Sequence, residues 1–165
     1  MHGATLLDEA GSVIRPAILW NDGRCQAQCL EIERTVSDSR VLTGNIMMPG
    51  FTAPKLLWVK NNEPERFNRI HKVLLPKDYL RFRLCGTFFS DMSDASGTMW
   101  MNTKERAWDE SLLAACGLSK KHMPELVEGP HVTGTLLPEL AQKWGMNEVP
   151  IVAGAGDNAA GALGV

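Results

Sequence analysis

The chain has 165 residues, of which 44% are hydrophobic and 22% charged, and its 17 Lys and Arg residues against 19 Asp and Glu residues leave a net charge of −2. This length suits one domain, the composition excludes an intrinsically disordered chain, and no apolar stretch approaches the roughly 20 residues of a membrane-spanning helix. No basic cluster is denser than Arg81-Phe82-Arg83 or Lys120-Lys121, so the sequence argues against nucleic-acid and membrane partners.

In chain order, the first predicted strand is the apolar run Pro16–Trp20, which we expect to be buried. Asn21–Gly23 follows it, and Asp22 is the predicted cap of a helix that runs from Arg24 to Val36. Apolar residues recur in this helix at intervals of three and four, as a buried face requires: Cys25, Cys29, Ile32 and Val36. A second helix is predicted over Ala53–Asn61.

The second half of the chain continues the alternation of strands and helices. A strand is predicted at Val73–Leu75, followed by a helix that Gly86 ends. Further helices are predicted over Trp108–Cys116 and Leu137–Trp144, and a last strand over Val149–Ala153, which enters a glycine-rich turn. Strands separated by helices predict an α/β fold with a partly parallel sheet.

The cysteines are spread along the chain, at Cys25, Cys29, Cys85 and Cys116. No second Cys or His pair follows the first two at the spacing of a zinc finger, so we predict buried thiols and no metal site. The first residues lack the basic flank and apolar run of a signal peptide, which predicts reduced cysteines and a cytoplasmic location.

Both ends of the sequence resemble the interior of a larger fold. The stretch Gly154–Val165 begins a strand-turn-helix unit and stops among apolar residues, and Gly3–Leu7 starts directly within an apolar element. We therefore expect the chain to be a fragment of a longer protein.

Polar residues that follow predicted strands form the candidate site, because open α/β sheets bind ligands at the carboxyl ends of their strands. Three segments qualify: Trp20–Arg24, Lys77–Tyr79 and Gly156–Asn158. In the last one, Gly154 and Gly156 allow a tight turn that brings Asp157 to the opening of a helix. An ionised carboxylate there can orient a hydroxyl and accept its proton. The alternative is that Asp157 only caps the helix.

The other polar segments have simpler explanations beside the functional ones. Trp20 with Asp22 and Arg24 suits a polyol site, or else a core Trp beside a cap and a surface Arg. The cluster of Asp91, Ser93, Asp94 and Ser96 is explained by caps and turns. Gly154-x-Gly156-x-x-Ala159 resembles a dinucleotide fingerprint only weakly, because Asp157 would repel a pyrophosphate, and a Walker loop is excluded by Ala162-Leu163 after Gly161.

Several long segments, in one order, resemble the FGGY family of carbohydrate kinases. Gly50–Asn62 fits the first signature of that family. Segments similar to its amino-terminal domain are Pro16–Arg24, Leu75–Leu80 and Ser90–Thr98, and Gly154–Gly161 looks like its catalytic segment. The likeness covers essentially all 165 residues, and at Met1–Ala4 it is closest to the members that phosphorylate D-xylulose.

The resemblance implies a ribonuclease H-like or actin-like ATPase fold, in which residues 1–165 form part of the amino-terminal, sugar-binding lobe. It implies ATP-dependent phosphorylation of D-xylulose on the 5-hydroxyl, giving D-xylulose 5-phosphate, with Asp157 as the catalytic base. By the same resemblance Met1, His2 and Asn158 match sugar-contacting positions. Trp20 and Asp22 would line the same pocket.

ATP and Mg²⁺ are the implied cofactors, yet the family's glycine-rich phosphate hairpin and its second actin-like domain have no counterpart in this sequence. We therefore expect the chain alone to lack kinase activity while keeping much of the sugar site. The alternatives are a non-catalytic sugar-binding or structural remnant, and a family member for another sugar or polyol, such as ribulose or glycerol. The sugar is the implied partner, and a homodimer is left open.

Overall fold

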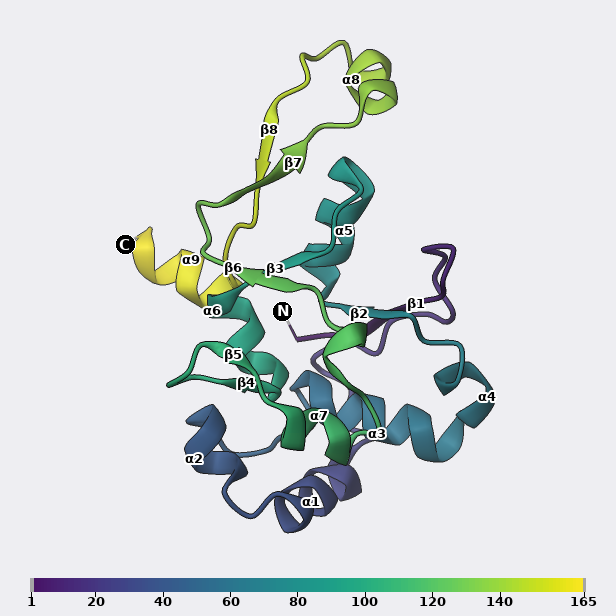
Figure 1. Ribbon diagram of the computed structural model, residues 1–165, viewed down its shortest axis with the longest axis vertical. Helices are drawn as coiled ribbons and strands as arrows, with labels where there is room; N and C mark the ends of the chain where they lie inside the picture. The colour runs from purple at the N-terminus through teal and green to yellow at the C-terminus, as the bar shows by residue number, and fades with distance from the viewer. Residues whose placement is uncertain (1, 165) are drawn as a thin grey trace.

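The computed structural model describes residues 2–164 (Figure 1). Its strands are β1 (Thr5–Leu7), β2 (Lys72–Leu74), β3 (Phe89–Asp91), β4 (Met101–Asn102), β5 (Ala107–Trp108), β6 (Glu125–Val127), β7 (Val132–Thr135) and β8 (Pro150–Val152). Its α-helices are α1 (Gln26–Thr35), α2 (Ser39–Thr43), α3 (Thr52–Asn62), α4 (Pro64–Phe67), α5 (Pro76–Cys85), α6 (Met92–Ala95), α7 (Glu110–Ala115), α8 (Pro138–Trp144) and α9 (Asp157–Leu163), and Ser96–Thr98 and Lys120–His122 form short 3-10 helices.

The described strands pair in twos rather than in one wide sheet. β1 with β2, β4 with β5 and β7 with β8 run antiparallel, whereas β3 and β6 run parallel, with Ser90 opposite Leu126. The mixture of helices and strands confirms the predicted α/β class, and the parallel pairing is confined to β3 and β6 within residues 2–164.

The hydrophobic core joins β1 and β2 to helices α1, α3 and α7. Leu6 and Leu56 are fully buried in it, and Trp100 packs against the same cluster with its indole N–H directed at the sulfur of Cys116, 3.4 Å away. Burying each large apolar side chain stabilises the fold by about 1.5–3 kcal/mol. This part of the molecule is therefore the stable base on which the site rests.

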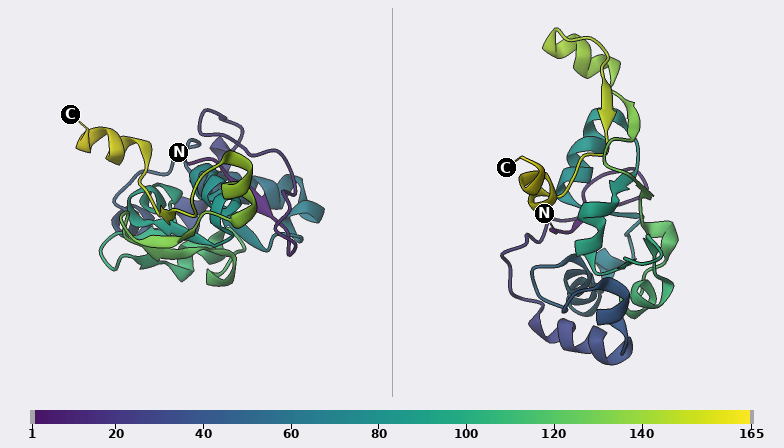
Figure 2. Two further views of the ribbon diagram at one scale, coloured as in Figure 1. Left: turned by 90° about the horizontal axis from the view of Figure 1, so that it is seen from above. Right: turned by 90° about the vertical axis from the view of Figure 1, so that its left-hand side faces the viewer.

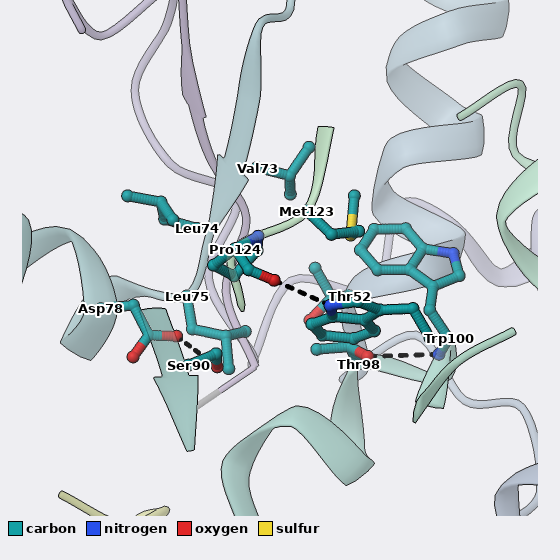
Figure 3. Close-up of a pocket in the computed structure, with 11 residues that line it drawn as sticks. Thr52, Val73, Leu74, Leu75, Asp78, Ser90, Thr98, Trp100, Met123 and Pro124 are labelled. Carbon is teal, nitrogen blue, oxygen red and sulfur yellow. Dashed lines mark hydrogen bonds between the residues drawn. The ribbon is translucent and has the colours of Figure 1, made fainter. Parts of the chain in front are cut away.

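One small cavity, of about 10 Å³, remains inside this core (Figure 3). Trp100 and Met123 lie on one side of it, and Asp78 lies at its border, where it accepts a hydrogen bond from Ser90 at 2.6 Å. The volume is that of about one water molecule. It is too small for a sugar, so the candidate site lies elsewhere.

The helices with the clearest apolar spacing form where the sequence predicts them. α3 covers the predicted segment, and α5 and α8 end at Gly86 and Gly145, whose φ angles are 75° and 64°. Glycine adopts this left-handed conformation without the steric penalty of a Cβ atom. The prediction of buried thiols is also confirmed, because all four cysteines are buried and free.

The predicted strand Pro16–Trp20 is wrong. Only Ile18 pairs, through an isolated antiparallel bridge with Ala4, and Trp20 is 65% exposed. Pro16 has no N–H to donate to a ladder, and the backbone N–H of Asp22 closes a turn onto the carbonyl of Leu19 at 3.2 Å. The apolar run is therefore a loop with one buried residue.

Two predicted helices are shorter than expected. α1 begins at Gln26 with Cys25 at the N-cap position, so Asp22 does not cap it. α7 begins at Glu110, because the carboxylate of Asp109 accepts the backbone N–H groups of the first turn, and Trp108 belongs to β5 instead. Both corrections concern the residue at which the helix begins: the Asp109 carboxylate caps α7, whereas α1 has no side-chain cap hydrogen bond.

An arm made of β7, α8 and β8 extends from one end of the molecule (Figure 1). The chain returns to the body along β8 and continues into α9, which contacts α6 and projects outward (Figure 2). Within residues 2–164 no helix combines the length and apolar character needed to cross a membrane.

Candidate functional site

A polar hollow opens where the residues before β1, the loop before α3 and the start of α9 come together. It consists of two adjoining cavities of about 320 Å³ each, which share His2, Phe51, Asp157 and Asn158. Trp20 and Gly50 complete one cavity, and small and polar residues complete the other: Asn45, Ser93, Asp94, Ser96, Gly97, Gly156 and Ala159. A space of this size accommodates a small ligand such as a monosaccharide.

His2 forms one wall of the polar hollow and is held from several sides. Its Nε2 atom lies 3.1 Å from Oδ1 of Asp94, and its ring centroid lies 5.5 Å from that of Phe51. The hydroxyl of Thr52 donates to the backbone carbonyl of His2 at 3.1 Å. Gly97 lies directly against the imidazole, and a Cβ atom there would overlap the ring. These contacts fix both the backbone and the ring of His2.

Asp94 sets the orientation of this imidazole from a buried position, with only 1% of its side chain exposed. Burial acts to raise the pKa of its carboxyl group, and the hydrogen bond with His2 acts to lower it. Asp94 thus holds Nε2 of His2, which lines both cavities of the hollow.

A second wall is formed by the turn that follows β8. Gly154 has a φ angle of 85°, and its N–H donates to the carbonyl of Gly129 at 3.0 Å. Gly156 packs against Asp94, since a Cβ atom at this position would lie 3.1 Å from Oδ1. The two glycines thus have different roles: the first supplies a left-handed backbone and the second permits a close approach.

Asp157 is the first residue of α9, and Gly156 occupies the N-cap position. Asp157 is therefore not the N-cap residue, and its exposed side chain lines both cavities of the hollow. The first turn of a helix favours an ionised carboxylate, since its backbone N–H groups point toward that end. The turn therefore presents a negative group to the hollow.

Asn158 and Trp20 supply the remaining predicted contacts that the structure brings to the hollow. Asn158 is the next residue of α9, and its amide offers both a donor and an acceptor. Trp20 lines the same cavity as His2 and Asp157, and its large exposed fraction leaves an apolar face toward that space. Amide and indole groups of this kind suit a polyol, which has hydroxyls on apolar C–H faces.

Two predicted residues are not brought to the hollow. Asp22 forms a bidentate ion pair with Arg24, with the shortest contact at 2.7 Å, and it does not line either cavity. The hydrogen bond from Arg24 lowers the pKa of Asp22 to about 2. The guanidinium of Arg24 in turn lies 4.8 Å from the ring centre of Trp58. Met1 lies outside the described residues.

Lys55 holds the loop that precedes α3, and the sequence analysis assigned it no role. Its side chain is fully buried, and Nζ donates to the carbonyls of Pro49 and Phe51 at 2.5 and 2.8 Å. The thiol of Cys25 donates to the Pro49 carbonyl as well, at 3.5 Å. Burial lowers the pKa of Lys55 to about 8. These contacts fix the loop that carries Phe51 to the hollow.

Lys77 and Ser93 form hydrogen bonds with the turn that precedes Asp157, although the sequence analysis assigned neither of them a specific role. Nζ of Lys77 donates to the carbonyl of Ala153 at 3.2 Å, and the N–H of Gly156 donates to the hydroxyl of Ser93 at 3.2 Å. Lys77 was one of the polar residues expected after a strand, and Ser93 belonged to the polar cluster ascribed to caps. Both residues are far from the turn in sequence, so no sequence pattern indicates these contacts.

The residues that line the hollow suit an uncharged ligand. No Lys or Arg is among them, and within residues 2–164 no group of three or more His, Cys, Asp and Glu is arranged to hold a metal ion. A nucleoside triphosphate with its Mg²⁺ needs cationic partners and oxygen ligands for the metal. The lining residues therefore do not fit that group.

Comparison with known protein families gives one match over nearly the whole chain. Residues 1–164 match the profile of the N-terminal domain of the FGGY family of carbohydrate kinases. The xylulose kinase of Escherichia coli (strain K12) is 64% identical over 165 residues, which is all of this chain and 34% of that protein. The chain spans about a third of the length of the curated relatives it matches.

Solved structures agree with this match. A xyloylose kinase from Brucella ovis superposes with a TM-score of 0.93 at 53% identity, over 97% of this chain and 33% of that one. A gluconate kinase from Lactobacillus acidophilus gives a TM-score of 0.89 at 28% identity, over 95% of this chain and 32% of that one. The predicted actin-like ATPase fold of the sugar kinases is confirmed.

Proposed function

Because this chain belongs to the FGGY family of carbohydrate kinases, we propose that the protein phosphorylates D-xylulose at the expense of ATP, giving D-xylulose 5-phosphate. Residues 1–165 then form part of the amino-terminal domain and carry the sugar site with its catalytic carboxylate. Support for the sugar comes from the relatives named xylulose kinase, which reach 64% identity. Support for the site comes from the polar hollow.

The observation that carries the proposal is the composition of the two walls around the hollow. Asp157 and Asn158 lie on one wall and His2 on the other, with Trp20 and Phe51 as apolar surfaces between them. A ketose presents hydroxyls to polar groups and C–H faces to aromatic rings. Without a cation in the lining, the hollow has no attraction for a sugar that is already phosphorylated.

Asp157 is the proposed base. Its carboxylate accepts a hydrogen bond from the sugar hydroxyl, orients the oxygen lone pair, and takes the proton as that hydroxyl becomes the nucleophile. His2, held by Asp94, and Asn158 bind the other hydroxyls and fix the sugar in one register. Alignment of this kind is the main contribution that phosphoryl transfer requires of a protein.

ATP is the second substrate of the proposed reaction and supplies the phosphoryl group, with Mg²⁺ neutralising its charge. We assign no contact with either to the lining residues, because they contain no Lys or Arg. We also propose a cytoplasmic location, since the four cysteines are buried free thiols, as expected in a reducing compartment.

The proposal is tested by the turnover of D-xylulose, D-ribulose, D-gluconate and glycerol by the full-length protein, followed by coupled detection of ADP. We expect D-xylulose to be preferred and Asp157→Asn to lower kcat by two to three orders of magnitude, because the base is removed. The matched control is Asp38→Asn, an exposed Asp at the N-cap position of α2 without a side-chain cap bond. Preference for another substrate reassigns the sugar, and unchanged turnover by Asp157→Asn removes Asp157 from the base role.

A further inference from the structure

Asp157 is placed by the turn at residues 153–156, which leads into α9. Two side chains from other elements, Lys77 and Ser93, form hydrogen bonds with the backbone of this turn. These contacts therefore bear directly on the alignment of the carboxylate.

Lys77 holds the beginning of this turn with its ammonium group. Nζ donates hydrogen bonds to Oδ1 of Asp78 at 2.6 Å and to the carbonyl of Ala153 at 3.2 Å. It also forms an ion pair with Oδ1 of Asp91, 2.6 Å away. The carboxylates are 0% and 1% exposed, and together they raise the pKa of Lys77 although its burial acts in the opposite direction.

Ser93 holds the end of the turn through the same carboxylate. Its hydroxyl donates to Oδ2 of Asp91 and accepts the backbone N–H of Gly156 at 3.2 Å. The Ser93 hydroxyl therefore donates one hydrogen bond and accepts another. Asp91 thus joins two contacts that lie on either side of Gly154, one at the Ala153 carbonyl and one at the Gly156 N–H.

We propose that Lys77, Asp91 and Ser93 are positioning residues for the reaction, which clamp the turn at Ala153 and Gly156 so that the carboxylate of Asp157 points at the sugar hydroxyl. The clamp deepens the proposed function and rests on it, because its purpose is to align the base. A displacement of about 1 Å at a reacting group can cost a hundredfold in rate.

The test uses Ser93→Ala in the full-length protein, because Lys77→Met would leave the buried carboxyl group of Asp91 without its cation and risks unfolding. We expect kcat to fall at least tenfold, while KM for D-xylulose changes less than threefold. Ser93→Thr keeps the hydroxyl and should restore most of the lost kcat. Hydrogen–deuterium exchange without substrate should become at least tenfold faster at Gly156, whose N–H loses its acceptor.

The matched control is Ser111→Ala, because Ser111 has the same local arrangement on a different surface. It follows the N-cap Asp109 by two residues and donates to that carboxylate, as Ser93 does to Asp91. It has no hydrogen bond to the turn. We expect its kcat, KM and exchange at Gly156 to match the wild type.

Each result decides the proposal. Faster exchange with a kcat loss that Ser93→Thr restores supports the clamp. Unchanged exchange, or faster exchange with normal kcat, overturns it. If Asp157→Asn keeps full turnover, the proposed function fails separately; a Ser93→Ala loss of kcat is then no longer explained by alignment of a base, and the positioning role is overturned with it.

Discussion

His2 and Asp157 line the same hollow from two different segments, and the chain holds these segments in different ways. The His2 wall is continuous with the hydrophobic core, through β1 and α3, where Leu6 and Leu56 are fully buried. The Asp157 wall returns from the arm and is held by polar contacts to Lys77 and Ser93, while α9 itself is largely exposed.

This difference separates two kinds of sensitivity. Apolar burial gives large, non-directional stabilisation, so damage to the core side should be seen as lost stability. Hydrogen bonds contribute only about 0.5–1.5 kcal/mol each, but they fix direction, so damage to the turn should be seen first as lost alignment. Substitutions on the two walls therefore test the comparison directly.

The buried ions behind the turn should give the largest effect on stability. Lys77→Met removes the cation between Asp78 and Asp91, both almost fully buried, and should lower the free energy of unfolding by about 3–5 kcal/mol. The exposed Lys120, paired with Glu110 at 3.0 Å, is the control, and Lys120→Met should cost less than about 1 kcal/mol. Urea denaturation of both variants measures the contrast, and equal losses would contradict it.

The next largest loss of stability should come from the hydrophobic core. Leu56→Ala creates a cavity in the fully packed cluster and should cost about 2–5 kcal/mol. Leu80→Ala removes the same atoms from an exposed position of α5 and should change stability by no more than about 0.5 kcal/mol. A loss at Leu80 as large as that at Leu56 would contradict the contrast between core and surface.

Gly97→Ala should disturb the His2 wall locally. The new Cβ atom would overlap the imidazole of His2, which must move away at a cost of about 1–3 kcal/mol in stability. KM for D-xylulose should then rise several-fold, since the displaced ring no longer meets the sugar. Gly23→Ala is the control, because no atom lies within 4 Å of the place that its new Cβ atom would occupy. Normal KM in Gly97→Ala would remove His2 from the sugar site.

The smallest effect should come from Asp22, which lies outside the hollow. Its pKa is lowered to about 2 by Arg24, so the pair stabilises the fold above the ordinary pKa of 3.8 and loses that stabilisation as the pH falls toward 2. Since the two side chains are 26% and 40% exposed, Asp22→Asn should cost at most about 1 kcal/mol at pH 7. Thermal unfolding at pH 7, 4 and 2 should show the difference between wild type and variant shrink strongly at pH 2, where Asp22 is about half protonated in the folded state, and a difference at pH 2 as large as at pH 7 would exclude the ion pair as its cause.

How far the sequence predicts the structure depends on the range of the interactions. The ends of α5 and α8 follow from Gly86 and Gly145, because a left-handed cap is a local matter. The exposure of Trp20 does not follow from the sequence, because an apolar run is buried only where the fold places another apolar surface against it.

The site shows the same division. The family resemblance pointed to His2, Asp157 and Asn158 as site residues. The structure brings all three to one hollow, while their roles stay predictions. The contact between Ser93 and Gly156 spans 63 residues, and no spacing rule relates them. Asp22 was predicted to line the site because it is close to Trp20 in sequence. In the structure its carboxylate instead forms a short ion pair with Arg24.

The most direct test of the account is whether one sugar contacts both walls. Calorimetric titration of the full-length protein with D-xylulose should give binding that His2→Ala and Asn158→Ala each weaken by about three- to tenfold, as the loss of one hydrogen bond predicts. His71→Ala, an exposed histidine outside the hollow, should leave Kd unchanged. If D-xylulose binds equally well to both wall variants, the sugar does not lie between His2 and α9, and the account is wrong.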